Sequence, residues 1–497
     1  MDWEIIIGLE VHAELLTKTK IFCGCTTDFG GEPNTHVCPV CSGMPGVLPK
    51  LNRTVVEYAV KLGLTLECEI TQNCKFDRKN YFYPDLPKAY QVSQLYAPIC
   101  QNGYMDININ GRKKSIGIRE IHMEEDAGKL IHAPEYGGTF MDFNRCGVPL
   151  LEIVSQPDFR NSDEVLAYLE QLRETMLYLG ICDCKMQEGS MRADINISVR
   201  KPGGELGVRT EMKNLNSFKA IRHAIEFESA RQIEMLEAGG QIVQETRRWN
   251  DDKLESSGMR TKENAQDYRY FPEPDLLPIH IDSTWIKSMK EGLPELAHKK
   301  RERYVRDYGL SEYAASQLTE HKNISDLFED VAAQSGAPSE STNLILCEIL
   351  RLMNKTNTLP ENLSIDGHKL SVLISLVIAG KINRSAYKET VEAVFTDNVD
   401  PETYIIEKSL MMLSDDKTVA DAVDVVLADN QVAVEDYRSG KDKALGFLVG
   451  QVMKKLGRAG NPEIVRDVLK EKASLKNQKG SGSESGLSSK NKKEFDN

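Results

Sequence analysis

The chain has 497 residues, of which 40% are hydrophobic and 28% charged, and these fractions are typical of a soluble globular protein. Its formal net charge of −13 argues against a generic nucleic-acid-binding protein, although from Lys441 onward 13 Lys and Arg outnumber 7 Asp and Glu. The length predicts about three domains. No run of about 18 apolar residues predicts a membrane span, and Asp2, Trp3 and Glu4 do not begin a secretory signal, so we expect a cytoplasmic protein without a membrane partner.

The first patterned segment, IIIGLEVHAEL, covers residues 5–15. Successive side chains of a β-strand point to opposite faces, so the apolar residues at odd positions share one face. Glu10, His12 and Glu14 share the other. The pattern therefore predicts a strand with one face for a hydrophobic core and one that concentrates two carboxylates and an imidazole.

Two closely spaced cysteine pairs, C-x-C and C-x-x-C with twelve residues between them, follow at Cys23, Cys25, Cys38 and Cys41. Such pairs on neighbouring turns present four thiolates to zinc, and free thiols are the alternative. A closed four-sulfur site leaves no open position, so this zinc would stabilise the fold. The total of 11 cysteines is odd, and with no export signal a disulfide framework is not expected. A further C-x-C, Cys182 and Cys184, has no second pair near it and is interpreted as core or incidental.

Three later segments repeat the strand pattern with charged residues on one face, namely residues 120–126, 190–200 and 208–213. In EIHMEED, His122 and Glu124 share a face, and Glu125 lies opposite unless a bulge turns it. The two later strands add basic residues to the acids. Their polar faces carry Arg192, Asp194, Asn196, Ser198 and Arg200 in one strand and Arg209, Glu211 and Lys213 in the other.

Each of these faces by itself is typical of the solvated side of an antiparallel sheet. The alternative is that the four faces are neighbours and form a site for Mg²⁺ and phosphate, because oxygen ligands suit Mg²⁺ and arginine suits phosphate. The metal candidates are then Glu10, His12, Glu124, Asp194 and Glu211, and the candidates for phosphate or a substrate carboxylate are Arg192, Arg200 and Lys213. No P-loop or dinucleotide-binding motif is present, which disfavours a P-loop ATPase or a Rossmann enzyme.

The pattern changes near residue 292 from short β-like runs to helical periods, which predicts a large α/β or α+β domain followed by helical domains. Near the C-terminus, apolar spacing predicts a helix over 445–456. Gly460 is the expected cap of that helix, and Asn461 with Pro462 begins the next one. The segment after about residue 475 has almost no apolar residues and is expected to be disordered. We predict domains at 1–292, 293–405 and 406–475, and a disordered extension at 476–497.

With these residues in view, the chain resembles the B subunits of the tRNA-dependent amidotransferases, the aspartyl/glutamyl-tRNA(Asn/Gln) amidotransferase family. The resemblance covers all but the last twenty or so residues. It rests on IGLEVHAEL, KFDRKNYFYPDLPKAYQVSQ, IHMEEDAGK, MDFNRCGVPLLEIVSQPD, EGSMRADINISVR, TEMKNLNSF, QETRRWN, DYRYFPEPDLLP and GKDKALGFLVGQVMKKLGRAGNP.

This resemblance implies an α+β fold. Its first domain would be a cradle related to glutamine synthetase and the guanidino kinases, with an antiparallel sheet facing ATP and metal. An all-α helical domain and a small helical tail that binds tRNA would follow.

The resemblance also implies a reaction, because a carboxylate must be activated before ammonia can replace its oxygen. The family uses ATP and Mg²⁺ to phosphorylate the side chain of mischarged Glu-tRNA(Gln) or Asp-tRNA(Asn), and ammonia then displaces the phosphate. Ammonia comes from a partner glutaminase, the amidase-type A subunit, in a heterotrimer with a small C subunit. The chain has no obvious amidase nucleophile loop, in agreement with this division of labour.

Carried over by motif, the resemblance assigns the metal and ATP site to Glu10, His12, Glu124, Glu125 and Glu211, with Asp194 beside them. It also places Lys79, Tyr81, Asp85 and Lys88 near the ammonia route, the alternative being an aromatic loop at a subunit interface. Three features depart from the family, one of which is the Gly/Ser/Lys-rich extension after Leu475, outside the family pattern. Many members lack the four cysteines, so zinc belongs to a subset, and Gln187 stands where an acid is common, which leaves Glu188 less secure as a ligand.

Two other functions fit parts of the sequence. A tRNA-binding module with a scaffolding cradle would bind tRNA without regard to Mg²⁺ or ATP. A stand-alone carboxylate–amine ligase would turn over small molecules without tRNA and would leave the basic C-terminus unexplained. The sequence does not determine whether tRNA(Gln), tRNA(Asn) or both are used.

Overall fold

The computed structural model describes residues 3–261, 268–412, 416–456 and 461–474. The chain divides into two compact units, Met1–Lys300 and Arg301–Asn497. The first contains the sheets and the second is helical, which confirms the expected α+β composition. The predicted cap at Gly460 and the predicted extension at 476–497 lie outside the described residues. No helix in the described part of the chain is both long and apolar enough to cross a membrane.

Among the described residues of the first unit, four strands of the large sheet have 10 to 14 residues, and the other strands have seven or fewer. In chain order the strands are β1 (Glu4–Glu14), β2 (Glu69–Ile70), β3 (Asn73–Cys74), β4 (Asp77–Asn80), β5 (Tyr90–Ser93), β6 (Cys100–Ile109), β7 (Arg112–Glu125), β8 (Lys129–Ala133), β9 (Gly138–Asp142), β10 (Pro149–Ser155), β11 (Met191–Arg200), β12 (Thr210–Lys213), β13 (Glu245–Asn250), β14 (Glu255–Thr261), β15 (Phe271–Pro272) and β16 (Ile279–His280).

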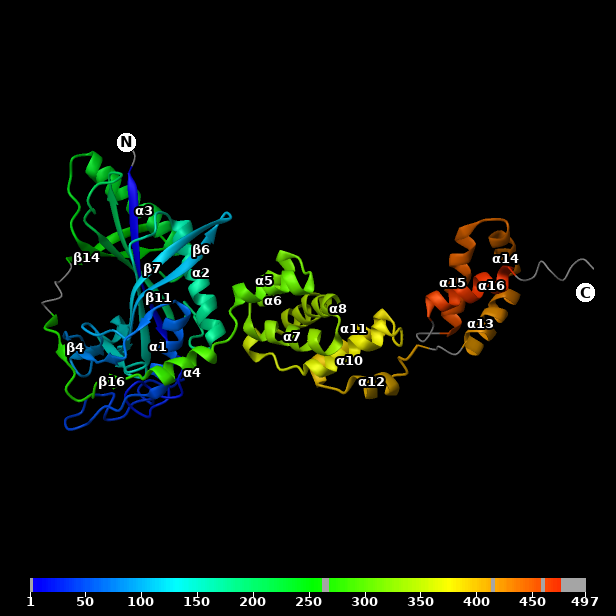
Figure 1. The fold of residues 1–497 in the computed structure, drawn as a ribbon, viewed down its shortest axis with the longest axis horizontal. Coiled ribbons are helices and arrows are strands. Elements are labelled where there is room, and N and C mark those ends of the chain that lie inside the picture. Colours follow the sequence, from blue (N-terminus) through cyan, green and yellow to red (C-terminus); the bar gives the residue numbers. More distant parts are fainter. Residues whose placement is uncertain (1–2, 262–267, 413–415, 457–460, 475–497) are drawn as a thin grey trace, which may run out of the picture. The chain divides into compact units, whose positions relative to one another are not determined.

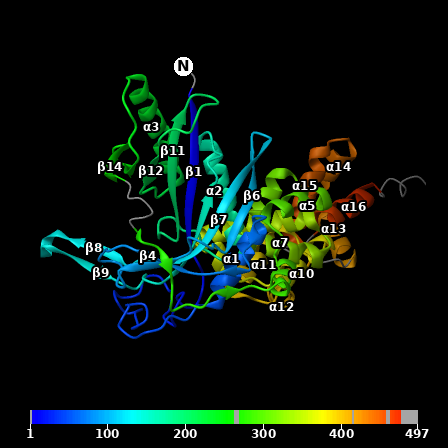
Figure 2. The same cartoon turned by 60° about the vertical axis from the view of Figure 1, so that its left-hand side comes forward.

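The large sheet has nine strands in the order β14-β13-β12-β11-β1-β10-β7-β6-β2. Neighbouring strands are antiparallel except β12 and β13. Strand β1 is at the centre (dark blue in Figure 1), between β10 and β11. Strands β8 and β9 form a separate hairpin that projects from this unit (Figure 2). The central position of β1 brings residues from distant parts of the sequence next to its polar face.

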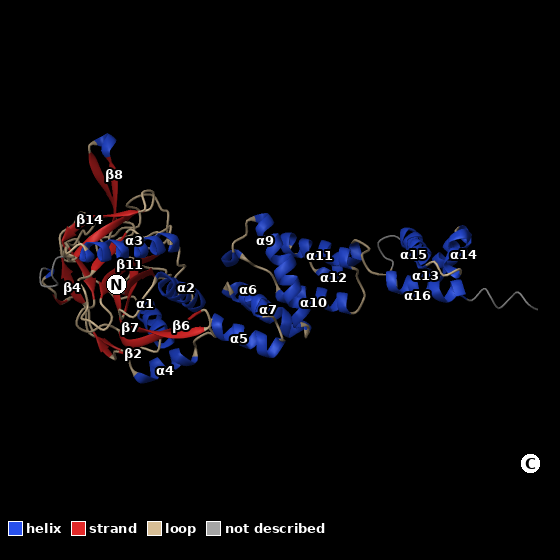
Figure 3. Ribbon diagram, turned by 90° about the horizontal axis from the view of Figure 1, so that it is seen from above, coloured by secondary structure: helices blue, strands red, loops and turns tan. Residues whose placement is uncertain are grey.

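Three helices cover one face of this sheet, α1 (Arg53–Thr65), α2 (Ser162–Leu179) and α3 (Phe218–Glu237), and they lie beside one another in Figure 3. The apolar face of β1 packs under them, with Ile7, Leu9 and Val11 at most 1% exposed. The predicted alternation of β1 is therefore confirmed. The opposite face of the sheet is left for the polar residues.

Helix α2 shows why these segments are helical. Val165, Leu169, Leu172 and Met176 recur at helical spacing and are fully buried. The Asn161 side chain accepts a hydrogen bond from the amide of Glu164 at 2.9 Å and caps the N-terminus. Gly180 ends the helix in the left-handed region, at φ 66°, where a side chain would be strained.

Among its described residues, the second unit contains two hydrophobic clusters, one formed by residues from Tyr304 to Leu410 and one by residues from Val419 to Leu469. The amide of Glu463 donates to Asn461, which confirms the predicted N-cap. The remaining helices are α4 (Ser283–Glu291), α5 (Ala297–Tyr308), α6 (Glu312–Thr319), α7 (Lys322–Ser335), α8 (Pro338–Asn343), α9 (Leu350–Thr356), α10 (Gly367–Ile378), α11 (Arg384–Asp397), α12 (Pro401–Glu407), α13 (Asp416–Asp429), α14 (Gln431–Arg438), α15 (Asp442–Leu456) and α16 (Pro462–Ser474), with the 3-10 helices η1 (Pro134–Tyr136) and η4 (Pro360–Asn362) and the π-helix η3 (Leu344–Ile349).

Candidate functional site

The polar face of the sheet is built from rows of residues that lie opposite one another on neighbouring strands. His12 of β1 lies opposite Arg192 of β11 on one side and Glu152 of β10 on the other. One row further along, Glu10 lies opposite Asp194. Directly opposed residues on one face of a sheet are close enough to interact, so the register itself assembles these charged groups.

The tightest group on this face consists of His12, Glu124 and Glu152. Nε2 of His12 lies 3.5 Å from Oε1 of Glu124 and 3.9 Å from Oε2 of Glu152, and ligand atoms of all three lie within 4.8 Å of one another. Burial, and then the charge of Glu152, raises the pKa of Glu124 to about 8. Two carboxylates this close, of which that of Glu124 is buried, repel unless a proton or a cation lies between them. The donor set therefore fits a divalent cation, to which the imidazole adds a nitrogen ligand because burial lowers the pKa of His12.

A second acidic group lies along β11 and β12. The ammonium of Lys213 pairs with Asp194 and lies 3.3 Å from Glu211. Glu211 also accepts a hydrogen bond from Thr246 at 2.8 Å, and Glu10 accepts one from Asn196 at 3.0 Å. The structure thus brings together Glu10, Asp194, Glu211 and Lys213, as the sequence patterns suggested.

Arg192 extends the site toward a buried carboxylate that follows β7. It donates to Asp126 at 3.2 Å, and Arg145 lies 2.5 Å from the same carboxylate. Burial raises the pKa of Asp126, but the positive charges of Arg192 and Arg145 outweigh this effect and keep the pKa below its usual value. Glu14 lies 2.8 Å from Arg145, and burial raises the pKa of Glu14 to about 7.

Two predicted residues lie apart from these groups. Arg200 is at the far end of β11, eight residues beyond Arg192 or about 26 Å along the strand, and donates to Glu4 at 2.7 Å. Glu125 lies on the opposite face from Glu124, where Lys88 contacts its two oxygens at 2.5 and 2.7 Å. No bulge between Pro149 and Val154 of β10 turns it back, so the alternation of β7 decides its side.

The KNYFYPDLPK segment contributes a lysine to the site. Nζ of Lys79 lies 5.6 Å from the ring of Tyr81 and 5.2 Å from that of Tyr268, within cation–π range. Although burial lowers it, Tyr270 and then Glu124 raise the pKa of Lys79. Lys79 is thus a positive charge held among tyrosine rings that interacts electrostatically with Glu124. Asp85 lies further away and accepts a hydrogen bond from the amide of Gly128 through its carbonyl.

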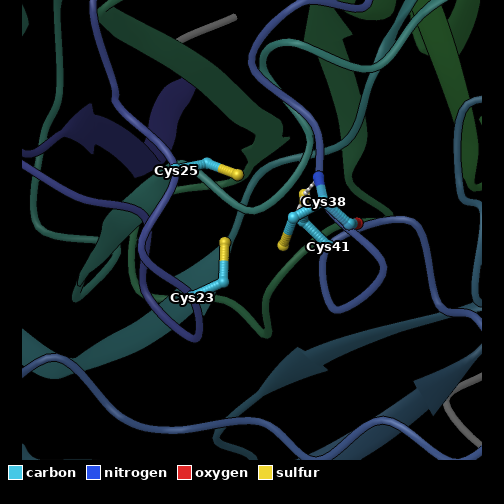
Figure 4. Close-up of side chains that lie close together, drawn as sticks. All are labelled: Cys23, Cys25, Cys38 and Cys41. Atoms are coloured by element: carbon cyan, nitrogen blue, oxygen red, sulfur yellow. Dashed lines mark hydrogen bonds between the residues drawn. The ribbon is translucent and has the colours of Figure 1, made fainter.

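Cys23, Cys25, Cys38 and Cys41 point their sulfur atoms toward a common centre (Figure 4), and the segment that carries them is called the cysteine knuckle. All four sulfurs lie within 4.8 Å of one another. A hydrogen bond with Cys23, opposed by burial, lowers the pKa of Cys41 to about 4, whereas the same hydrogen bond, and then burial, raise the pKa of Cys23, so that the two thiols share one proton. The cluster could therefore hold a metal ion that prefers sulfur. Cys182 and Cys184, in contrast, are buried in the core and contact each other, with the amide of Cys184 donating to the sulfur of Cys182.

The sequence patterns missed three contributors to the site. Glu152 is the single acid of the apolar run PLLEIVS, and that isolation is a signal that it faces something polar. Asp126 and Arg145 lie outside regular strands, where no periodicity reports the direction of a side chain. They join the site through chain connections that only the folded structure reveals.

Two family models match most of the chain. Residues 5–287 match the GatB/GatE catalytic domain, and residues 326–473 match the GatB domain. The sheet with its polar site thus falls within the segment that is similar to a catalytic domain.

Curated relatives that share one name match nearly end to end, and each is the B subunit of an aspartyl/glutamyl-tRNA(Asn/Gln) amidotransferase. The relative from Lachnoclostridium phytofermentans is 56% identical over 470 residues, 94% of this chain and 98% of that protein. Those of Caldicellulosiruptor bescii and Lachnospira eligens are each 53% identical over 95% of this chain and 99% of their own length. The chain therefore belongs to the family of aspartyl/glutamyl-tRNA(Asn/Gln) amidotransferase B subunits.

Proposed function

We propose that this chain performs the ATP-dependent activation and amidation of mischarged Glu-tRNA(Gln), Asp-tRNA(Asn) or both. The observation that carries the proposal is the close group of His12, Glu124 and Glu152, of which Glu124 is buried. Phosphoryl transfer depends mainly on positioning and on electrostatic stabilisation, and this group together with the nearby basic residues suits both. The similarity to B subunits of aspartyl/glutamyl-tRNA(Asn/Gln) amidotransferases supports the tRNA substrate.

In this proposal Mg²⁺ and ATP bind along the polar face. His12, Glu124 and Glu152 hold one cation, and Glu10 and Glu211 are the further ligands. The resemblance assigns a metal-ligand role to Glu125, but Glu125 is paired with Lys88 on the other face of the sheet. We therefore propose Glu152 as the ligand instead of Glu125. The metal would neutralise phosphate charge when bound.

The basic residues of this face have separate roles. Lys213 and Arg192 lie on the same face as the acids, and each is held by a carboxylate, Asp194 and Asp126 respectively. They are suited to orient the transferred phosphoryl group or the substrate carboxylate. Transfer of the γ-phosphoryl group to the side-chain carboxylate releases ADP. Ammonia then attacks the carbonyl carbon, phosphate leaves, and the nitrogen loses a proton.

The remaining parts of the chain supply partners and substrates. Ammonia is delivered by the glutaminase, an amidase-type A subunit in a heterotrimer with a small C subunit, past Lys79, Tyr81, Asp85 and Lys88. The cradle of residues 1–292 adopts a fold similar to glutamine synthetase, residues 293–405 form a helical domain, and the tail of residues 406–475 binds tRNA.

The four-cysteine knuckle holds structural Zn²⁺ in this proposal. Its geometry is that of a closed sulfur site, and the metal would stabilise the fold. Metal analysis of the purified chain should find about one equivalent, with the four thiols protected from a thiol reagent until a chelator is added. Much less metal, with all four thiols freely titratable, would remove the zinc site.

The experiment that tests the function uses the chain co-expressed with its partner subunits, ATP and Mg²⁺, with ammonium in place of glutamine. Ammonium bypasses the glutaminase, so product formation reports the activation and amidation steps. We expect Gln-tRNA from Glu-tRNA or Asn-tRNA from Asp-tRNA, and no product without ATP. Binding of tRNA without any product would favour a scaffold, and turnover of free glutamate without tRNA would favour a stand-alone ligase.

A further inference from the structure

One lysine of the knuckle region is completely buried. Lys20 is 0% exposed, and its ammonium donates to the carbonyl of His36 at 2.7 Å and to that of Phe143 at 3.3 Å. Its third contact is Sγ of Cys41, at 3.7 Å. In the described part of the chain no carboxylate forms an ion pair with Lys20. A buried ammonium needs a negative partner, and the thiolate of Cys41 is the group in contact that can supply it.

The positive charge of the Lys20 ammonium is better matched by four metal-bound thiolates than by four neutral thiols. Four thiolates around Zn²⁺ carry a net charge of about −2, which a buried ammonium in hydrogen-bonding contact partly offsets. Groups that contact metal ligands without touching the metal commonly set its affinity. Lys20 is thus placed as a positioning residue for the cluster.

The cysteine knuckle also contacts a second lysine, Lys88, whose side chain is 14% exposed. At Gly43, two residues after Cys41, the chain turns with φ +68°, and a Cβ atom there would lie 2.5 Å from Cγ of Lys88. The absence of a side chain lets the turn pack directly on the stem of Lys88. That lysine ends on Glu125, with Nζ 2.5 Å from one of its oxygens. A cavity of about 220 Å³ is lined by both parts, including Lys20, Cys23, Cys41, Gly43, Lys88 and Glu125.

We propose that metal at the four cysteines positions Lys88 against Glu125, and that Lys20 supplies the positive charge that the thiolate set requires. The metal holds the turn at Gly43 in place, and the turn presses the stem of Lys88 toward Glu125. Metal binding at the cysteine knuckle therefore acts beyond the knuckle itself, because it decides whether the ion pair between Lys88 and Glu125 forms. The inference rests on the proposed zinc site but not on the proposed amidation.

The test is the chemical reactivity of individual lysines in the full chain with and without Zn²⁺. A small amine-acylating reagent is applied, and labelling of each lysine is quantified by mass spectrometry. Removal of zinc by a chelator should raise the labelling rate of Lys88 at least tenfold, and re-addition of zinc should restore it. Lys114 is a matched control, because it also forms an ion pair, with Glu164 at 2.7 Å, and should not respond. An unchanged Lys88 rate in protein that loses and regains one zinc would overturn the inference while leaving the zinc site intact.

Two variants separate the parts of the proposal. Lys20→Met should weaken Zn²⁺ affinity about 10- to 100-fold in competition with a chelator, whereas Lys18→Met, two residues away and exposed, should not. Gly43→Ala should make Lys88 reactive even with zinc bound, because the new methyl group occupies the space of its stem. Equal zinc affinities of the two Lys variants would contradict the role of Lys20. A protected Lys88 in Gly43→Ala would contradict the role of the turn, and a chain that binds no zinc would overturn the whole inference.

Discussion

Replacing Glu124 by glutamine tests whether the buried carboxylates are arranged for a cation. Glutamine keeps the shape of the side chain and removes its charge. In the metal-free protein Glu124 lies in a buried position 3.5 Å from His12 and near Glu152, so its charge is costly. The variant should therefore be more stable than the wild type without metal and should lose the stabilisation that Mg²⁺ provides.

The magnitude follows from the pKa. A pKa of Glu124 raised from 4.5 to about 8 means that the folded protein keeps a proton that the unfolded chain releases. The stability of the metal-free wild type should thus fall as the pH rises from about 4.5 to about 8. At about 1.4 kcal/mol per pKa unit, the loss approaches about 5 kcal/mol, which is an upper limit because the site can relax. Glutamine does not titrate, so the variant should lack this contribution.

The assay is urea unfolding at pH 6 and pH 8, with a chelator or with Mg²⁺. All three tryptophans of the chain, Trp3, Trp249 and Trp285, lie in the first unit, so their fluorescence reports the unit that contains the site. At pH 8 without metal the variant should be the more stable protein, and with saturating Mg²⁺ the order should reverse, because only the wild type binds it tightly. Equal stabilities at pH 8 without metal, or equal stabilisation of both proteins by Mg²⁺, would refute this reasoning.

Three further predictions follow from other contacts. Glu228→Gln removes a fully buried carboxylate that accepts two hydrogen bonds from Arg231, at 2.7 and 2.8 Å, and should cost about 3 to 5 kcal/mol in urea unfolding at pH 7. Burial raises the pKa of Glu228, but Arg231 and its neighbours outweigh burial and lower this pKa below its usual value. The stabilisation by the ionised carboxylate is therefore present above about pH 4.5 and is lost as the pH falls. An equal cost of the substitution at pH 3 would contradict this prediction. Lys213→Met should lower ATP turnover at least about tenfold, whereas Arg200→Met should change it less than about twofold, and equal losses would place Arg200 in the site after all. Removal of residues 413–497 should weaken tRNA binding in a filter assay more than it weakens ATP binding, and equal losses would argue against a tRNA-binding tail.

The strand faces could be predicted because a strand repeats every two residues. That period placed Glu10 and His12 on one face of β1 and the core residues on the other, as the burial of Leu9 and Val11 confirms. Strand β11 follows the same rule. Which strands pair with one another could not be predicted in this way, because the paired strands are separated by many residues in the sequence. The neighbours of β1 come from residues near 150 and near 195, and no local pattern indicates that order.

The site was predictable to the same degree. Its acids on regular strands were found, but Glu152 was missed because a single acid in an apolar run has no period of its own. Arg200 was assigned to phosphate by its chemistry alone, and its distance along β11 pairs it with Glu4 instead. Glu125 illustrates the converse, because the two-residue period already placed it opposite Glu124, and the structure shows Lys88 as its partner there.

The most direct test of the central claim is ammonium-driven amidation by the complex carrying Glu152→Gln. Glu135→Gln, an exposed acid of the same unit, is the matched control. If activation of the substrate carboxylate takes place at His12, Glu124 and Glu152, the Glu152 variant should form product at least about 100-fold more slowly, while tRNA binding and folding stay unchanged and the control keeps its full rate. A Glu152→Gln complex that amidates Glu-tRNA or Asp-tRNA within about twofold of the wild-type rate would show that the chemistry takes place elsewhere.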